Sequence, residues 1–314
     1  MIHVLSLVLP LFALIAVGFA AGKVWKISID GLAWLNIFIL YVSLPALFFR
    51  LLADTPIDQF SNIAFLVRAA LGTLVIFLLG FGIARLIRRA TIPASTIQGF
   101  AGAYGNIGYL GPPLAIAAFG PEAGVPVALI FCIDNSMHFT LAPLLMSVGE
   151  KGAQSRIAII RQILNRIFTH PFILATIAGI SVAWLKWSIP APLDSFLLML
   201  SGAAAPCALF AMGVTAALRP LKRVPPELGY LVPIKLVIHP LLMYFLLKPV
   251  QGLDEVWLYT AVLLAALPAA TNVFVIAQQY RVWEERASSA VVVSTIGSLF
   301  TVTAFLYAAN HGLL

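Results

Sequence analysis

The sequence predicts an all-α membrane protein with ten transmembrane helices, and three observations support this prediction. Hydrophobic residues make up 61% of the 314 residues and charged residues only 10%, and the mean hydropathy is +1.02. No soluble domain of this size could cover so much apolar surface. The apolar residues form runs of about 20, the length that an α-helix needs to cross a bilayer. Basic residues lie between alternate runs, as is typical of cytoplasmic loops.

Ten apolar runs are long enough to serve as spans, and their order predicts the topology. We place them at 4–22, 32–52, 62–86, 94–119, 123–148, 166–187, 192–218, 228–248, 256–279 and 286–309. Most of the 19 basic residues then lie on one side, so the positive-inside rule puts the N-terminus and the C-terminus outside. The net charge of +7 is therefore a topology signal and does not indicate a nucleic-acid partner. Cys132 and Cys207 lie inside apolar runs, where we expect them to serve as packing residues.

The two halves of the chain share features at similar spacing, which predicts an inverted 5+5 repeat. Five spans per half start the second half on the opposite side of the membrane. The first repeat would be 1–150, the short cytoplasmic linker 151–165, and the second, inverted repeat 166–314. The matched features are LPALFF at 44–49 with APCALF at 205–210, Arg68 with Lys235, Asn106 with Asn272, and Asp134 with Thr295.

Two of these spans contain residues that disrupt a helix. GNIGYLGPP at 105–113 falls in span four, and Pro268 to Asn272 fall in span nine. A broken backbone at membrane depth is tolerated where it is buried in protein or lines a watery cavity. Unwinding frees N–H groups at one half-helix end and carbonyls at the other, which can bind substrates and ions. We therefore expect two broken helices to cross, with Asn106 and Asn272 facing each other. The alternative is that these residues only kink or pack the helices.

GNIGYLGPP, followed in the second half by LPAATNVFVIAQQY, resembles the auxin efflux carrier family over essentially the whole chain. That family includes plant auxin carriers and bacterial permeases for malonate, malate and similar organic anions. The resemblance implies a fold similar to bile acid sodium symporters and sodium/proton antiporters. A scaffold of spans 1, 2, 6 and 7 would hold a mobile core of spans 3–5 and 8–10. The long central loop of the plant carriers is missing here, which argues against auxin as the substrate.

The resemblance also implies positions for the substrate site. Carried over by position, the crossover residues that would bind substrate are Gly105, Asn106, Ile107, Gly108, Pro268, Ala270, Thr271 and Asn272. A homodimer through the scaffold would suit the family, and the similarity to bacterial members suggests the bacterial inner membrane.

Polar residues inside the spans are candidates for ion coupling. Asp134 lies near the middle of span five, and a carboxylate there needs a partner or a proton. With it we group Asn135, His138, Ser294 and Thr295 as candidate coupling residues. Arg68 and Lys235 would attract an anion or pair with Asp134. The alternatives are a structural aspartate, a hydrogen-bonded histidine, polar contacts between helices and basic side chains that snorkel to the headgroups.

These features favour a secondary active transporter, or permease, that moves a small organic anion such as a di- or monocarboxylate by alternating, elevator-like access. No cofactor or metal is expected, apart from a coupling proton or sodium ion. The alternatives are a sensor or channel-like protein on a transporter fold and, less favoured, a membrane-embedded enzyme. The sequence has no G-x-x-x-x-G-K-[ST], H-E-x-x-H or G-x-S-x-G motif. We therefore expect no catalytic residues.

Overall fold

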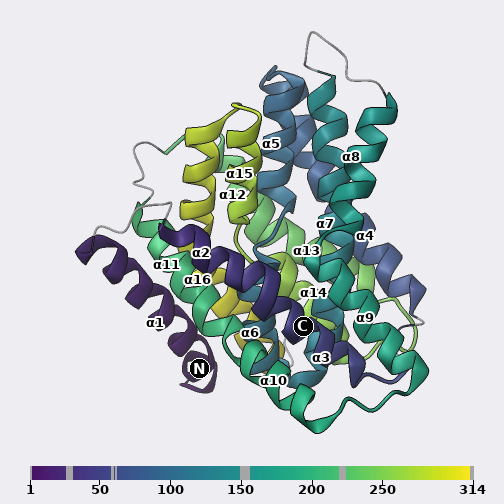
Figure 1. Ribbon diagram of the computed structural model, residues 1–314. Helices are drawn as coiled ribbons and strands as arrows, with labels where there is room; N and C mark the ends of the chain where they lie inside the picture. Colours follow the sequence, from purple (N-terminus) through teal and green to yellow (C-terminus); the bar gives the residue numbers. More distant parts are fainter. Residues whose placement is uncertain are drawn as a thin grey trace. The chain divides into compact units, whose positions relative to one another are not determined.

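The computed structural model describes residues 2–25, 31–57, 60, 62–148, 156–218 and 224–311 (Figure 1). Every regular element within these residues is helical, so the predicted all-α class is confirmed. The elements are α1 (Ile2–Val24), α2 (Gly31–Phe38), η1 (Ile39–Ser43), α3 (Leu44–Ala53), α4 (Ile63–Gly82), η3 (Ile83–Ile87), α5 (Ile92–Ala103), α6 (Ile107–Phe119), η4 (Pro121–Ala123), α7 (Gly124–Ser147), α8 (Arg156–Phe168), α9 (Pro171–Leu185), α10 (Ala191–Gly202), α11 (Ala204–Leu218), α12 (Leu228–Pro233), η5 (Ile234–Ile238), α13 (His239–Leu247), α14 (Glu255–Ala266), α15 (Thr271–Gln279) and α16 (Glu284–Asn310).

Six helices in the described part of the chain are long and apolar enough to cross a membrane, or up to seven if α8 and α9 form one span. Shorter apolar helices include α6, α14 and Leu9–Val24. Spans four and nine, each predicted as one helix with an internal disruption, are divided into α5 with α6 and into α14 with α15. The total of ten spans stays a prediction. Of the predicted linker 151–165, the first five residues lie outside the described part, and the rest belongs to α8.

The chain forms two compact units, each built from segments far apart in the sequence. Unit 1 comprises Met1–Ile63, Gly108–Cys132 and Thr169–Pro220, and unit 2 comprises Ala64–Ile107, Ile133–Phe168 and Leu221–Leu314. The two repeats expected from the sequence, 1–150 and 166–314, are each continuous along the chain, unlike these units. The repeats stay a prediction.

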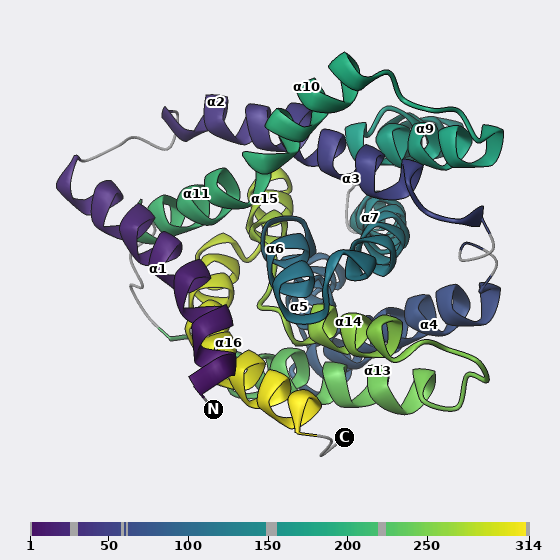
Figure 2. The same ribbon diagram turned by 90° about the horizontal axis from the view of Figure 1, so that it is seen from below.

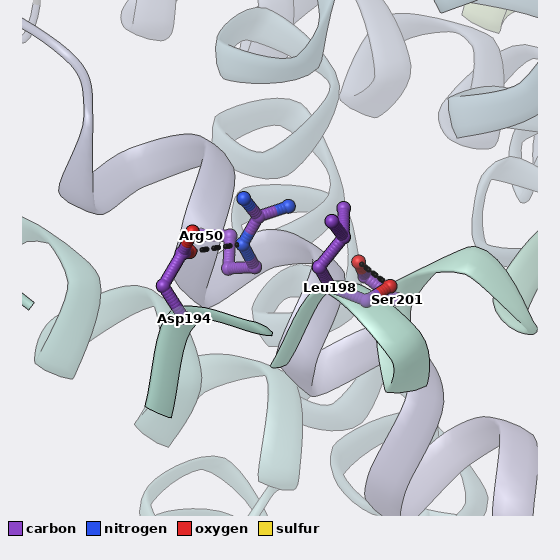
Figure 3. A network of polar contacts seen from close by, with 4 residues as sticks. All are labelled: Arg50, Asp194, Leu198 and Ser201. Atoms are coloured by element: carbon purple, nitrogen blue, oxygen red, sulfur yellow. Dashed lines mark hydrogen bonds and ion pairs between the residues drawn. The ribbon is translucent and has the colours of Figure 1, made fainter. Parts of the chain in front are cut away.

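Unit 1 is held together by helix pairs and by an aromatic core. Helix α1 packs along α11, and α3 packs against α9 and α10 (Figures 1 and 2). Phe48 in α3 contacts Phe131 and Phe172, with ring centroids 5.7 and 5.3 Å away. At the end of α3 the Arg50 guanidinium donates to the Asp194 carboxylate at 2.7 Å (Figure 3). This ion pair joins α3 to the start of α10.

Unit 2 contains α4, α5 and α12 to α16, with a buried core between them. Helix α13 packs against α14, and α15 packs against α16. Phe77 of α4 and Phe100 of α5 lie in this core with ring centroids 5.1 Å apart. The packing of α4 on α5 is close, because a Cβ on Gly99 would lie 2.9 Å from the Phe77 carbonyl oxygen. The two helices that lead into the candidate site, α5 and α14, therefore both belong to the compact unit 2.

Candidate functional site

Two helices of unit 2 end at breaks in the middle of apolar segments. Helix α5 starts at Thr91, whose side chain accepts a hydrogen bond from the Ala94 N–H as an N-cap, and it ends at Tyr104 in an extended conformation. Helix α14 starts at Asp254, which caps it through the Val256 N–H, and it ends at Leu267, also extended. Both helices therefore start at a side-chain cap and end beside residues that sequence analysis singled out, Gly105 and Pro268.

The two breaks pair with each other through their backbones. The Asn106 N–H donates to the Pro268 carbonyl and the Ala270 N–H to the Tyr104 carbonyl, each at 2.8 Å. Gly105 and Ala269 form an antiparallel bridge between these bonds. We call the paired segments 104–106 and 267–270 the crossover. It satisfies backbone groups that unwinding would leave unbonded in an apolar interior.

The position of the first break differs from the motif that predicted it. Tyr104 to Asn106 form the break, whereas Pro112 and Pro113 lie inside α6. Pro113 and Pro112 therefore do not interrupt that helix, which is consistent with the tolerance of proline in transmembrane helices. In span nine the break includes Pro268, as expected.

The crossover is tightly packed at Gly105. A Cβ at this position would lie 3.1 Å from the Leu264 carbonyl oxygen and 3.4 Å from Lys235 Nζ. On the opposite strand of the bridge, the Ala269 N–H donates to Ser294 Oγ at 3.0 Å. Gly105 thus allows close approach, and Ser294 of α16 supports the crossover from the second-half side.

Tyr104 connects the crossover to α7 and α15. Its hydroxyl donates to Asn135 Oδ1 at 2.5 Å and accepts from Asn272 Nδ2 at 2.9 Å. Its ring stacks on His138, with centroids 4.0 Å apart and planes 8° apart. His138 Nδ1 lies 2.5 Å from the Asp134 carbonyl oxygen, so this nitrogen carries the proton. Tyr104 therefore brings three predicted site residues, Asn135, His138 and Asn272, into one network.

Two opposite charges are buried beside the crossover. Lys235 is 0% exposed and Asp134 is 3% exposed. Lys235 Nζ donates to the Ala265 carbonyl at 2.6 Å and lies 3.2 Å from His239 Nδ1. Lys235 therefore does not snorkel to headgroups. It binds the C-terminal end of α14, where the helix dipole is negative.

Helix α15 begins at the crossover and presents its N-terminal end there. The N–H groups of Ala270 and Val273 are taken by the Tyr104 and Ala270 carbonyls, whereas those of Thr271 and Asn272, the first two residues of the helix, have no partner within the helix. Asn272 is exposed and Thr271 half-buried, while Gly105, Asn106, Pro268 and Ala270 are buried. A helix N-terminus favours anions. The accessible N-terminal end of α15, next to the crossover, can therefore accept a carboxylate.

The remaining predicted site residues lie elsewhere or point to other partners. Gly108 belongs to unit 1, where a Cβ would lie 3.0 Å from the Phe131 ring. The Arg68 guanidinium donates to the Leu246 carbonyl at 2.9 Å, and the Thr295 hydroxyl donates to the Val291 carbonyl of its own helix. Ile107 is buried directly after the break. Their functional roles, and the expected contact between the amides of Asn106 and Asn272, stay predictions.

Two residues of the network were not singled out by sequence reasoning. Tyr104 directly precedes the glycine of the first motif, and a tyrosine at a helix break in an apolar span was the signal that could have identified it. His239 follows Lys235 by one helical turn, a spacing that puts both side chains on one face. In the described part of the chain, no group of three His, Cys, Asp or Glu side chains is arranged to hold a metal ion.

Comparisons with known proteins agree with a membrane transporter. A family model described as "Membrane transport protein" matches residues 3–306. A protein of Rhizobium meliloti (strain 1021) named "Putative malonate transporter" is 50% identical over 314 residues, covering 100% of this chain and 98% of that one. "Uncharacterized transporter YfdV" of Escherichia coli (strain K12) is 24% identical and covers 95% of both chains. An "Uncharacterized transporter" of Methanothermobacter thermautotrophicus is 27% identical and covers 94% of this chain and 95% of its own.

The match to the family model spans nearly the whole chain, and the relatives are named as transporters and not as enzymes. Together with the apolar helices, these matches establish a multi-pass integral membrane protein. The resemblance noted in the sequence is thereby confirmed. The chain belongs to the auxin efflux carrier family of membrane transport proteins.

Proposed function

We propose that this protein is a secondary active transporter that moves a small organic anion, a di- or monocarboxylate such as malonate, by alternating access. The observation that carries the proposal is the crossover, where two broken helices are paired backbone to backbone within unit 2. Such breaks in transporters place half-helix ends near the middle of the membrane, where substrates bind.

The chemistry of the crossover supports an anion as the substrate. The N-terminal end of α15 and the Asn272 amide offer hydrogen-bond donors, and Lys235 supplies positive charge nearby. A carboxylate accepts hydrogen bonds from such donors, and charge-assisted bonds of this kind are stronger than neutral ones. The name of the Rhizobium meliloti relative makes malonate the first compound to test.

Asp134 supports coupling of transport to an ion gradient. Its side chain is buried and interacts electrostatically with Lys235. The backbone carbonyl of the same residue accepts from His138, whose ring stacks on Tyr104 at the crossover. A buried carboxylate with one cationic neighbour can exchange a proton, or help to ligate sodium, as the site changes exposure. We propose that one of these two ions drives accumulation of the anion, and no other cofactor is required.

The two compact units suggest how alternating access would occur. Unit 1 contains the segments expected to form the scaffold together with Gly108–Cys132 from the expected core, and unit 2 contains the crossover, Asp134 and Lys235. In our proposal spans 3–5 and 8–10, which include most of unit 2, move as an elevator-like core. We also propose that the chain crosses the membrane ten times as an inverted repeat, with both termini outside. The membrane would be a bacterial inner membrane, and two copies would form a homodimer through the scaffold.

Uptake by proteoliposomes tests the proposal. Purified protein is reconstituted, and accumulation of radiolabelled malonate, malate and monocarboxylates is measured under imposed proton, sodium or voltage gradients. We expect saturable accumulation of at least one anion, with counterflow. Asp134→Asn is expected to remove the dependence on the proton or sodium gradient while exchange of labelled for unlabelled anion continues.

The matched control is Asp194→Asn, which removes a carboxylate paired with Arg50 in unit 1. It should leave gradient dependence unchanged. Absence of uptake and counterflow for every anion, with folded protein, would reject the anion transporter. A non-saturable flux would indicate a channel, and gradient dependence that survives in Asp134→Asn would reject Asp134 as the coupling residue.

A further inference from the structure

An apolar groove on unit 2 lies between η5, α13, α14 and α16 and has a volume of ≈ 260 Å³. None of the crossover residues lines it. Figure 2 shows α13 beside α14, the pair that forms one side of the groove. Three lining residues, Ala266, Ala304 and Ala308, are alanines, and their short side chains leave space that larger residues would fill. The groove therefore exists because small side chains lie where these helices meet.

The groove opens on an apolar exposed surface. Val237 and Leu241 line it and are 47% and 48% exposed, and Phe245, in the next turn of α13, is also exposed. In a multi-pass membrane protein such a surface faces lipid tails, since exposed apolar patches of this kind are rare on surfaces that contact water. The molecule available to fill the groove is therefore a lipid acyl chain.

One end of the groove carries a positive charge. Tyr244 lines the groove, and its hydroxyl accepts a hydrogen bond from Lys248, the residue that follows α13. The Lys248 ammonium also lies over the Tyr244 ring, 4.8 Å from its centroid. An exposed lysine side chain is positively charged at neutral pH. Tyrosine and lysine at a helix end are typical of the membrane interface, where the phosphates of lipids lie.

The dimensions fit a lipid with its headgroup at Lys248. From Leu236 to Tyr244 the groove follows the helix for about 12 Å, and Lys248 lies about 6 Å, roughly one turn, beyond it. We propose that the groove binds one acyl chain of an anionic phospholipid, with the lipid phosphate held by Lys248 next to the Tyr244 hydroxyl. This inference does not depend on which anion the protein transports.

Native mass spectrometry of the purified, delipidated full-length chain tests the proposal. The protein is titrated with phosphatidylglycerol or with phosphatidylethanolamine that has the same acyl chains. We expect one phosphatidylglycerol to bind in preference to phosphatidylethanolamine. Lys248→Gln should reduce this preference about fivefold, the effect of one basic residue near an anionic lipid surface. Ala304→Phe should weaken the binding of both lipids, because the ring fills the groove.

Two variants serve as matched controls. Lys186→Gln removes another exposed lysine just after a helix, and Ile296→Phe enlarges an exposed apolar side chain of α16 outside the groove. Both should bind lipid as the wild type does. Equal binding of the two lipids by the wild type, or unchanged binding in Lys248→Gln and Ala304→Phe, would overturn the proposal. If Ala304→Phe instead reduced dimerisation without any change in lipid binding, the groove would be a contact between copies of the chain, and the lipid site would be rejected.

Discussion

Tyr104 is the residue on which the organisation of the candidate site depends most. Its carbonyl holds α15 through Ala270, its hydroxyl bridges Asn135 and Asn272, and its ring packs on His138. One side chain thus joins the crossover to α7, which carries Asp134. A substitution at Tyr104 should therefore lower the transport rate more than a substitution that removes a single hydrogen bond elsewhere in the protein.

Tyr104→Phe keeps the ring and removes only the hydroxyl. Two side-chain hydrogen bonds are lost, each worth about 0.5–1.5 kcal/mol, so we expect the transport rate at low anion concentration to fall by roughly fivefold or more. The measurement is initial uptake by proteoliposomes. Tyr109→Phe is the matched control, because that hydroxyl donates to Asn36 within unit 1. Equal rates for Tyr104→Phe and the wild type would show that the hydroxyl network has no part in transport.

The buried pair Lys235 and Asp134 gives a prediction about stability. Both groups are buried and interact electrostatically, so removal of one should destabilise the protein, by less than the value of about 3–5 kcal/mol lost when a buried pair in direct contact is broken. Lys235→Met should therefore lower the thermal unfolding temperature in detergent, whereas exposed Lys186→Met should not. The double variant Lys235→Met with Asp134→Asn should be more stable than the sum of the single effects, because the two residues interact. Additive effects would argue against the pairing.

At the scale of elements, helix pairs in unit 1 depend on glycines that allow backbones to approach. A Cβ on Gly213 of α11 would lie 2.0 Å from the Ile15 carbonyl oxygen, and one on Gly18 would lie 2.1 Å from the Phe210 carbonyl oxygen. Both clashes involve backbone atoms, which cannot rotate away. Small residues at such positions are typical of helix pairs in membranes. The packing of α1 on α11 therefore requires glycine at these positions.

Gly213→Ala should separate α1 from α11 and destabilise the protein. Overpacking of this kind costs about 1–3 kcal/mol, so we expect a lower unfolding temperature and a lower yield of folded protein. Gly202→Ala is the control, since nothing lies within 4 Å of a Cβ at the end of α10. The prediction fails if both variants unfold at the same temperature as the wild type.

The elements also show what local sequence could predict. The helix breaks were expected near Gly105 and Pro268 because glycine and proline weaken a helix regardless of distant contacts. The start of the first break at Tyr104 was not expected, because it is fixed by pairing with residues 267–270, far along the chain. The two prolines at 112 and 113 show the same limit, since they lie inside a helix in spite of their local preference.

At the scale of the whole molecule, composition predicted the membrane class, and the family resemblance predicted the transporter. The resemblance also implied a scaffold of spans 1, 2, 6 and 7 and a core of spans 3–5 and 8–10. It did not predict that Gly108–Cys132, from spans four and five, groups with unit 1, because that grouping depends on contacts between residues far apart in sequence. The same holds for His239, whose place beside Lys235 and the end of α14 depends on how α13 packs against α14. Asp134 was singled out as a carboxylate within a span, and Asn272 from the repeat and the family resemblance. Tyr104, which bonds Asn272 and stacks on His138, required the fold.

The central claim of this account is that the crossover binds a small carboxylate. The most direct test is equilibrium binding of radiolabelled malonate to purified protein, comparing the wild type with Asn272→Ala and, as control, Asn36→Ala of unit 1. Hydrogen bonds to charged groups are worth about 1.5–3 kcal/mol. We expect saturable binding by the wild type and by Asn36→Ala, and affinity lowered by about tenfold or more in Asn272→Ala. Unchanged affinity in Asn272→Ala would contradict the claim.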